Sequence, residues 1–422
     1  MLRQEHRILS VALALAALLL LILPLNHTAG LRNTLLVAGF GLVLWQHGRA
    51  ALPTLPALKW LLLAWVVLTG ASALWSQNAA FSLREFKLET LLGGMGFWLF
   101  LSLGRDEKQV RWFFRAVAAA VIVTALLAMY RILVVGVPNY HWDELNDPWG
   151  WQQGFVSYST YLVLAFPAVL YLLWRGEGAD RGLAGLALVL MLWAGWATQN
   201  RMFWVAMLAV FASSAGLWYL KSFARLRSRV LPLVAIGVML LGMAGAFSLV
   251  AENRPANALV ADSATGMQAA VHTLEHSERF LIWHYWLGQV PQHPWLGVGF
   301  GRDLPRLVYQ KPADWPELFF AHAHNVFIDV LLQLGAVGLT LFVLLLAALA
   351  LRFWGYFRSD DAGLASLGLF GLSFMVAFAG KNFTDDMFWR TDALFFWCMI
   401  GLTLGLGERL HVRVDAGDVR GE

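Results

Sequence analysis

The chain has 422 residues, of which 59% are hydrophobic and only 14% are charged. A soluble globular protein of this size carries more charge, so the composition excludes that class. The net charge of +4 does not indicate nucleic acid as a partner, because the basic residues are spread over short segments between apolar runs. The single cysteine, Cys398, excludes an internal disulfide, and its place in an apolar run favours a buried structural residue.

Apolar runs long enough to cross a membrane recur along the chain. A bilayer core needs about 20 apolar residues per helix, and the backbone inside lipid must satisfy its own hydrogen bonds, so these runs predict α-helices. The sequence therefore predicts an all-α polytopic integral membrane protein whose residues 1–422 form a single membrane domain. Twelve transmembrane helices are expected, over residues 8–25, 33–48, 57–75, 86–103, 110–134, 155–174, 182–199, 201–220, 230–250, 325–354, 362–380 and 392–408. The first is expected to be retained, because no small-residue cleavage site follows it.

The distribution of Lys and Arg predicts the orientation of these helices. When the N-terminus is placed in the cytoplasm, most of the 31 Lys and Arg residues fall at cytoplasmic helix ends. Short loops rich in these residues stay on the cytoplasmic side of a membrane. Both termini are therefore expected in the cytoplasm, and residues 251–324 are expected to form a long loop on the outer face.

Loops of this length are usually functional or partly folded. Within it, residues 267–289 have a helical rhythm whose apolar side carries Phe280, Trp283, Leu287 and Val290. The glycine-rich run 297–301 follows no predicted strand and opens no evident helix, so a nucleotide-binding loop is not indicated. A flexible turn is expected there.

Two histidines close the long loop in the stretch His322-Ala323-His324-Asn325. In an extended approach to the next helix, both side chains would point the same way. Asn325 is a good N-cap residue, so His324 is expected at a helix N-terminus, where the helix dipole disfavours the imidazolium form. A neutral histidine can accept a proton, which suits a general base, although two structural histidines would show the same pattern.

A catalytic metal is the second functional interpretation of this pair. Two histidines need at least one further ligand. The remaining candidates in the loop have no tight ligand spacing: His272, Glu275, His276 and His293. We therefore expect no metal and no other cofactor.

Basic residues on the outer face could bind a phosphate group instead. Arg201 lies in a very short turn between two helices, where an unpaired charge close to hydrocarbon is costly. Arg279 follows Glu278 in the long loop. Arginine binds phosphate through two parallel hydrogen bonds, so both residues are candidates for a pyrophosphate site. Weaker candidates, for which lipid-headgroup contacts or ion pairs are the alternative, are Arg84, Lys87, Lys381 and Arg390.

Three local patterns stand out beside the topology. The first is Gln199-Asn200-Arg201. The second is Ser277-Glu278-Arg279, followed by Trp283 and by Pro294-Trp295-Leu296-Gly297-Val298-Gly299. The third and most specific is His322-Ala323-His324-Asn325, which leads into Leu334-Gly335-Ala336-Val337-Gly338-Leu339. Together with the topology, these patterns resemble the O-antigen ligase family, although Asn200 stands where Ser is more usual.

This resemblance implies a GT-C-like glycosyltransferase in the inner membrane of a Gram-negative bacterium. Its donor would be O-antigen linked to undecaprenyl pyrophosphate, and its acceptor would be the lipid A–core oligosaccharide, joined without a metal on the periplasmic face. By the same resemblance His324 would be the base, and Arg201 and Arg279 would hold the pyrophosphate. His322 is the second candidate catalytic residue, which could orient His324, contact the acceptor or only pack. Direct displacement at the anomeric carbon would invert its configuration.

Other functions remain open at this level. An O-antigen polymerase or a protein O-oligosaccharyltransferase would use the same donor. The Arg-x10-Gly pattern of many polymerases is absent from the long loop, and little sequence follows the last predicted helix, so both features favour the ligase. A transporter or flippase is the alternative from another class, but its charged residues would lie near the bilayer midplane rather than cluster at one face.

Overall fold

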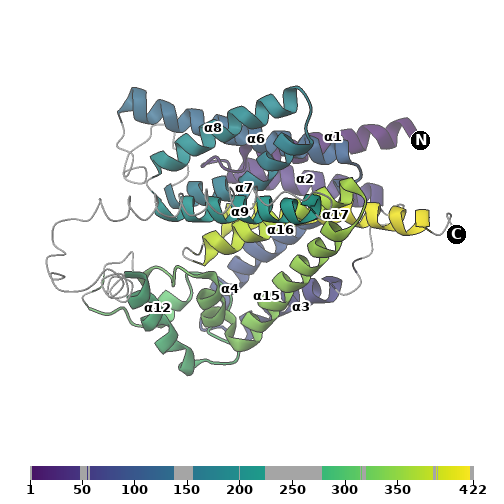
Figure 1. Ribbon diagram of the computed structural model, residues 1–422. Coiled ribbons are helices and arrows are strands. Elements are labelled where there is room, and N and C mark those ends of the chain that lie inside the picture. The colour runs from purple at the N-terminus through teal and green to yellow at the C-terminus, as the bar shows by residue number, and fades with distance from the viewer. Residues whose placement is uncertain are drawn as a thin grey trace.

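The computed structural model shows an all-α bundle (Figure 1). The predicted fold class, an all-α polytopic membrane protein, is confirmed. The structure describes residues 2–47, 55, 58–136, 155–198, 200–223, 278–313, 315, 320–383, 386 and 388–418.

The helices of the described residues are α1 (Leu2–Ile22), α2 (Ala29–His47), α3 (Leu58–Ala71), α4 (Ala79–Glu85), α5 (Leu92–Leu103), α6 (Glu107–Tyr130), α7 (Phe155–Arg175), α8 (Ala179–Ala197), α9 (Arg201–Phe223), α12 (Glu278–Gln289), α13 (Pro305–Val308), α15 (Val326–Arg358), α16 (Ala362–Asn382) and α17 (Arg390–Asp418). A π-helical turn, Phe86–Leu91, joins α4 to α5. Another π-helical turn, Arg131–Val135, extends α6.

Seven helical stretches of the described residues are long and apolar enough to cross a membrane: Ala79–Leu103, Glu107–Val135, Ser157–Arg175, Met202–Lys221, Val326–Arg358, Ala362–Asn382 and Arg390–Val414. The helix expected at 230–250 lies outside the described residues, so the total of twelve spans stays a prediction.

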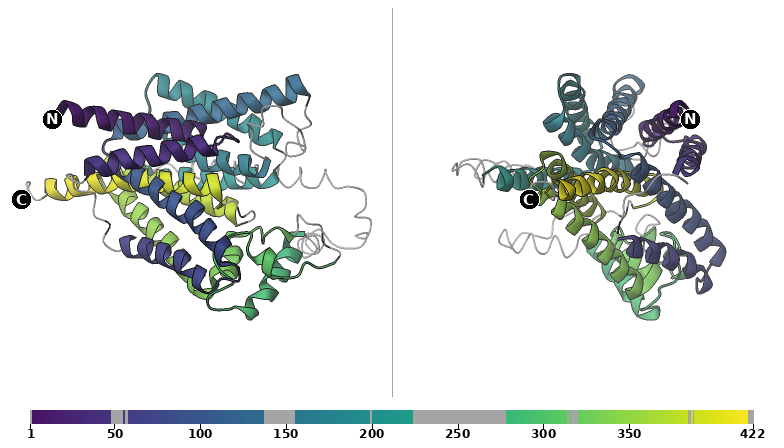
Figure 2. Two further views of the ribbon diagram at one scale, coloured as in Figure 1. Left: turned by 180° about the vertical axis from the view of Figure 1, so that it is seen from behind. Right: turned by 90° about the vertical axis from the view of Figure 1, so that its right-hand side faces the viewer.

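Helix α16 lies at the centre of the packing. It contacts α15, α9, α7 and α17, and α17 in turn packs along α5. The N-terminal end of α1 and the C-terminal end of α17 lie at one end of the bundle, whereas α12 lies at the other (Figures 1 and 2). We call the latter the α12 end.

The described part of the long loop is folded around a small core of its own. Trp286 stacks on Phe320 with 5.2 Å between ring centroids, and this core continues onto the first turns of α15. The buried side of α12 carries Ile282 and Trp286. Phe280 and Leu287, which the helical rhythm placed on the apolar side, are exposed. The residues of this core therefore anchor the loop firmly to α15.

The glycine-rich run 297–301 is buried and hydrogen-bonded, so the predicted flexible turn is wrong. The N–H groups of Val298 and Gly299 donate to the carbonyls of Leu332 and Gln333 in α15, at 3.0 and 2.9 Å. These carbonyls are available because α15 kinks at Gly335, where φ is +63°. An interrupted helix frees backbone groups that another segment must satisfy.

The kink depends on the absence of a side chain at Gly335. A Cβ atom there would lie 2.2 Å from the backbone of Trp295. Replacing Gly335 by Ala should lower the free energy of unfolding by roughly 1–3 kcal/mol, because both the left-handed conformation and the contact become unfavourable. Thermal unfolding of the purified protein in detergent measures the change.

Gly355→Ala is the matched control for that substitution. Gly355 lies in the same helix, and a Cβ there would meet nothing within 4 Å. Ala at this position should be neutral or stabilising by up to about 1 kcal/mol. Equal unfolding midpoints for the two variants would contradict the assignment of Gly335 as a required kink.

Candidate functional site

Polar and charged residues from four parts of the chain converge at the α12 end. They come from the π-helical turn after α4, the segment that follows the glycine-rich run, the start of α15 and the link between α16 and α17. The residues that line or adjoin a common narrow cavity are Glu85, Glu89, Arg302, Gln333, Asp386, Trp389 and Arg390. His322 lies beside this group through Asp329 and Asp386, and the ring of His324 lies against that of His322.

The stretch His322-Ala323-His324-Asn325 ends in the predicted N-cap. The Asn325 side-chain oxygen accepts hydrogen bonds from the N–H groups of Phe327 and Ile328, at 2.9 and 3.3 Å. The Asn325 amide also donates to the carbonyl of Phe383 at 3.0 Å. This second bond joins the start of α15 to the end of α16, so the histidines are fixed relative to both helices.

The two histidine rings lie close together, but the approach to α15 is not extended as expected. His324 adopts a left-handed conformation with φ of +53°. Its N–H donates to Nδ1 of His322 at 3.0 Å, and the two ring centroids are 4.0 Å apart. His322 is buried, whereas His324 is partly exposed. His324 is therefore the better placed of the two to meet a substrate.

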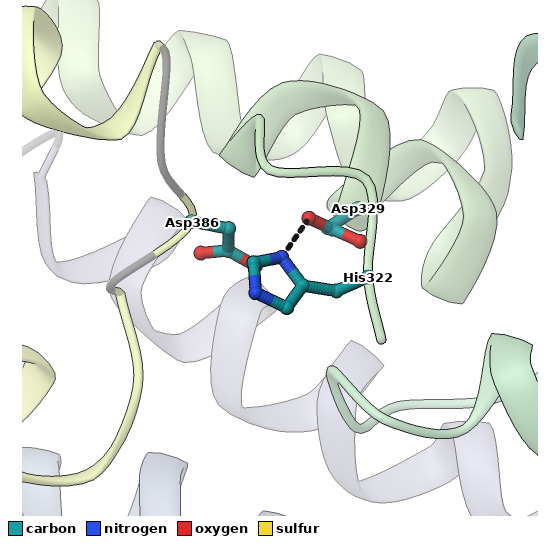
Figure 3. A group of neighbouring side chains, drawn as sticks. All are labelled: His322, Asp329 and Asp386. Atoms are coloured by element: carbon teal, nitrogen blue, oxygen red, sulfur yellow. Dashed lines mark ion pairs between the residues drawn. The ribbon is translucent and has the colours of Figure 1, made fainter. Parts of the chain in front are cut away.

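Two buried carboxyl groups lie beside His322 (Figure 3). Asp329 accepts a hydrogen bond from the Ala323 N–H at 3.0 Å, and its other oxygen is 3.7 Å from Nδ1 of His322. Burial and then the charge of Asp329 raise the pKa of Asp386 from its usual 3.8 to about 7, although Arg302 acts in the opposite direction. Two carboxyls this close favour sharing a proton. Sequence analysis singled out neither residue.

The same three side chains form a possible cation site. The ligand atoms of His322, Asp329 and Asp386 lie within 4.8 Å of one another. However, the Nδ1 lone pair already accepts the His324 N–H, and one Asp329 oxygen already accepts the Ala323 N–H. A metal ion would have to displace the first of these bonds. The donor set thus fits a hydrogen-bonded cluster better than a cation site.

Arg302 is the cation that sequence analysis missed. Its side chain is only 12% exposed, lines the cavity, and stacks on Trp389 with 4.1 Å from Cζ to the ring centroid. One nitrogen donates to the carbonyl of Asp386 at 2.9 Å. The Nε atom is buried without a hydrogen-bond partner, because the nearest carboxylate, Asp303, is 3.6 Å away. Arg302 therefore retains donor capacity at the cavity.

The other predicted basic residues divide into three groups. Arg390 pairs with Glu85 and Glu89 at 2.9 and 3.0 Å, and Lys381 is fully buried in α16. Arg84 and Lys87 are exposed, away from the face that carries Glu85 and Glu89. The structure thus commits Arg390 to carboxylates and leaves Arg84 and Lys87 outside the cluster.

The two arginines expected to hold a pyrophosphate lie on α9 and α12. Arg279 is in the first turn of α12 and is half-buried. One turn later, Trp283 contacts Phe383 at 5.9 Å between ring centroids, and the Phe383 carbonyl binds Asn325. This part of α12 is therefore close to the histidine stretch. Arg201 is the first residue of α9, and its side chain is outside the described part of the structure.

Two adjacent cavities give the site an amphiphilic shape. The narrow cavity has about 40 Å³, and Arg302, Asp386 and Gln333 are among the residues that line it. A larger apolar cavity of about 410 Å³ runs between α3 and α5. Trp65, Thr90 and Trp397 line both cavities. Charged and apolar walls are therefore adjacent at these two cavities.

The raised pKa of Asp386 predicts a pH dependence of stability. Between about pH 4 and pH 7 the folded protein holds a proton that the unfolded chain has released, so stability falls as pH rises through this range. Asp386→Asn should remove this contribution. The unfolding midpoint of the wild-type protein should then fall more between about pH 5 and pH 8 than that of the variant.

Asp360→Asn is the control, because Asp360 is an exposed carboxyl at a distant helix end. It should keep the wild-type pH dependence. If Asp386→Asn and the wild-type protein lose stability in parallel as pH rises, the buried Asp386 carboxyl does not titrate as described.

Residues 186–343 match the family described as O-antigen ligase. The match covers α12, Arg302 and both histidines, and it ends before Asp386. A search of curated proteins finds no match.

Proposed function

We propose that this chain, in which residues 186–343 match the O-antigen ligase family, transfers a glycan from undecaprenyl pyrophosphate to the lipid A–core oligosaccharide. The reaction would take place at the α12 end, on the periplasmic face of the inner membrane. The N-terminal end of α1 and the C-terminal end of α17, at the opposite end of the bundle, would then face the cytoplasm (Figure 1).

The observation that carries this proposal is the contiguity of the two cavities. An undecaprenyl chain is apolar and its pyrophosphate is charged, so the donor needs an apolar groove that ends at fixed positive charge. The cavity between α3 and α5 supplies the apolar groove, and Arg302 supplies the positive charge. Arg279 and Arg201 are the further arginines that we propose for the pyrophosphate.

In this mechanism His324 removes the proton of the attacking sugar hydroxyl. It directly precedes the N-cap of α15, and the positive end of the helix dipole favours a neutral imidazole there. The hydroxyl oxygen attacks the anomeric carbon, the bond to the pyrophosphate oxygen breaks, and the leaving charge is met by the arginines. One displacement of this kind inverts the anomeric configuration, and retention in the product by NMR would reject it.

The test of the base is ligation by purified protein supplied with lipid-linked glycan and lipid A–core. His324→Ala should lower the transfer rate by roughly 10²- to 10⁴-fold, as expected for loss of a general base. His284→Ala removes an exposed histidine of α12 and should leave the rate unchanged. Undiminished ligation by His324→Ala would reject His324 as the base.

The same assay separates the related activities. Glycan attached to lipid A–core supports a ligase. Growth of the lipid-linked glycan itself, without attachment to lipid A–core, would instead show a polymerase.

Arg302 gives a separate test of donor binding. Arg302→Ala should weaken donor-lipid affinity by roughly 10- to 100-fold, because a buried charge-assisted contact is lost. Arg306→Ala is the matched control: Arg306 lies 3.7 Å from the same carboxylate, Asp303, but is 45% exposed. Equal affinities for the two variants in a donor-lipid binding assay would exclude Arg302 from the pyrophosphate site.

A further inference from the structure

His324 has an unusual backbone for a residue with a long side chain. Its φ of +53° is in the left-handed region, which only a few per cent of residues other than glycine adopt, histidine more often than most. Such a conformation persists only where neighbouring groups hold it, and it is concentrated at functional positions. The orientation of the His324 ring therefore depends on the contacts that fix this turn.

Two side-chain acceptors hold the turn. Asp329 of α15 accepts the N–H of Ala323 at 3.0 Å. His322 accepts the N–H of His324 at 3.0 Å through Nδ1. The second bond has the form of an Asx-turn, in which a side-chain acceptor binds the N–H two residues later.

The His322 bond also defines which form of the ring is present. A nitrogen that accepts a hydrogen bond carries no proton, so the proton of a neutral His322 is on Nε2. The ring is only 6% exposed. Its Nδ1 is thus already used by the backbone and cannot take a proton from a substrate without releasing His324.

We propose that His322 is a positioning residue, which holds the left-handed turn of His324 through the Nδ1 bond and so aims the His324 ring at the acceptor hydroxyl. This inference rests on the proposed function, in which His324 is the base. It assigns the two histidines different tasks: His324 accepts the proton, and His322 fixes the orientation of the His324 ring. Misplacing a reacting group by about 1 Å can cost roughly 10²-fold in rate.

The experiment compares three substitutions at one position. The side-chain oxygen of Asn can occupy the place of Nδ1 and accept the same N–H, whereas Gln places its polar atoms where Nε2 lies. Ala removes both. His322→Asn should transfer glycan within about 3-fold of the wild-type rate, and His322→Gln and His322→Ala should lose roughly 10²-fold in kcat.

The donor KM should change little in all three variants, because the pyrophosphate contacts are elsewhere. Failure of His322→Asn to restore kcat above the level of His322→Ala would overturn the positioning role. Equal rescue by Gln would also overturn it, since the acceptor would then be needed at Nε2.

Amide hydrogen exchange of the peptide containing His324 provides a readout that does not need activity. Its exchange should be faster in His322→Ala and His322→Gln than in the wild-type protein and His322→Asn. Unchanged exchange in His322→Ala, measured on protein with the wild-type unfolding midpoint, would contradict the proposed bond. If the wild-type chain transfers no glycan, the proposed function fails, and the exchange measurement still decides whether His322 holds the turn.

Discussion

The backbone pairing between residues 294–299 and the kink of α15 is the constraint on which the site depends. Ala336 donates to the carbonyl of Pro294, and Val298 donates to that of Leu332. These bonds cross from the long loop to a helix that is apolar enough to span a membrane. They set where Arg302, three residues after Gly299, enters the bundle. The loop is thus bonded directly to α15 at this point rather than forming a separate cover over the bundle.

A second consequence is the concentration of charge at one end of the bundle. Arg302 and Arg390 both lie against Trp389, at 4.1 and 4.7 Å from Cζ to the ring centroid. Buried charges are costly unless they are paired or hydrogen-bonded, and Arg390 meets this condition through two carboxylates. Arg302 is less fully hydrogen-bonded, because its Nε atom lacks a hydrogen-bond partner. An incoming anion would complete its environment, which is why we place the pyrophosphate there.

The sequence was most informative where local chemistry decides the structure. Long apolar runs predicted the helices, and Asn325 predicted the start of α15, because an N-cap needs only its neighbours.

The sequence was least informative where segments that are distant in the chain meet in the fold. Arg302 directly follows the glycine-rich run, but the signal was lost because that run was interpreted only as a nucleotide loop or a flexible turn. Positive φ angles at Gly299 and Gly301, and their close contacts with Ser76 and Glu85, explain those glycines instead. Asp386 follows another acidic residue in the short link between α16 and α17. This pattern indicates an ion pair, but it does not predict that the Asp386 side chain is buried beside His322.

The central claim is that the two adjacent cavities, which share Trp65, Thr90 and Trp397, bind the donor. A structure of the protein with undecaprenyl pyrophosphate bound tests this claim most directly. We predict that the isoprenoid chain occupies the cavity between α3 and α5 and that the pyrophosphate lies within hydrogen-bonding distance of Arg302. A pyrophosphate held elsewhere, for example at the apolar cavity lined by Trp174 and Trp218, would contradict the account.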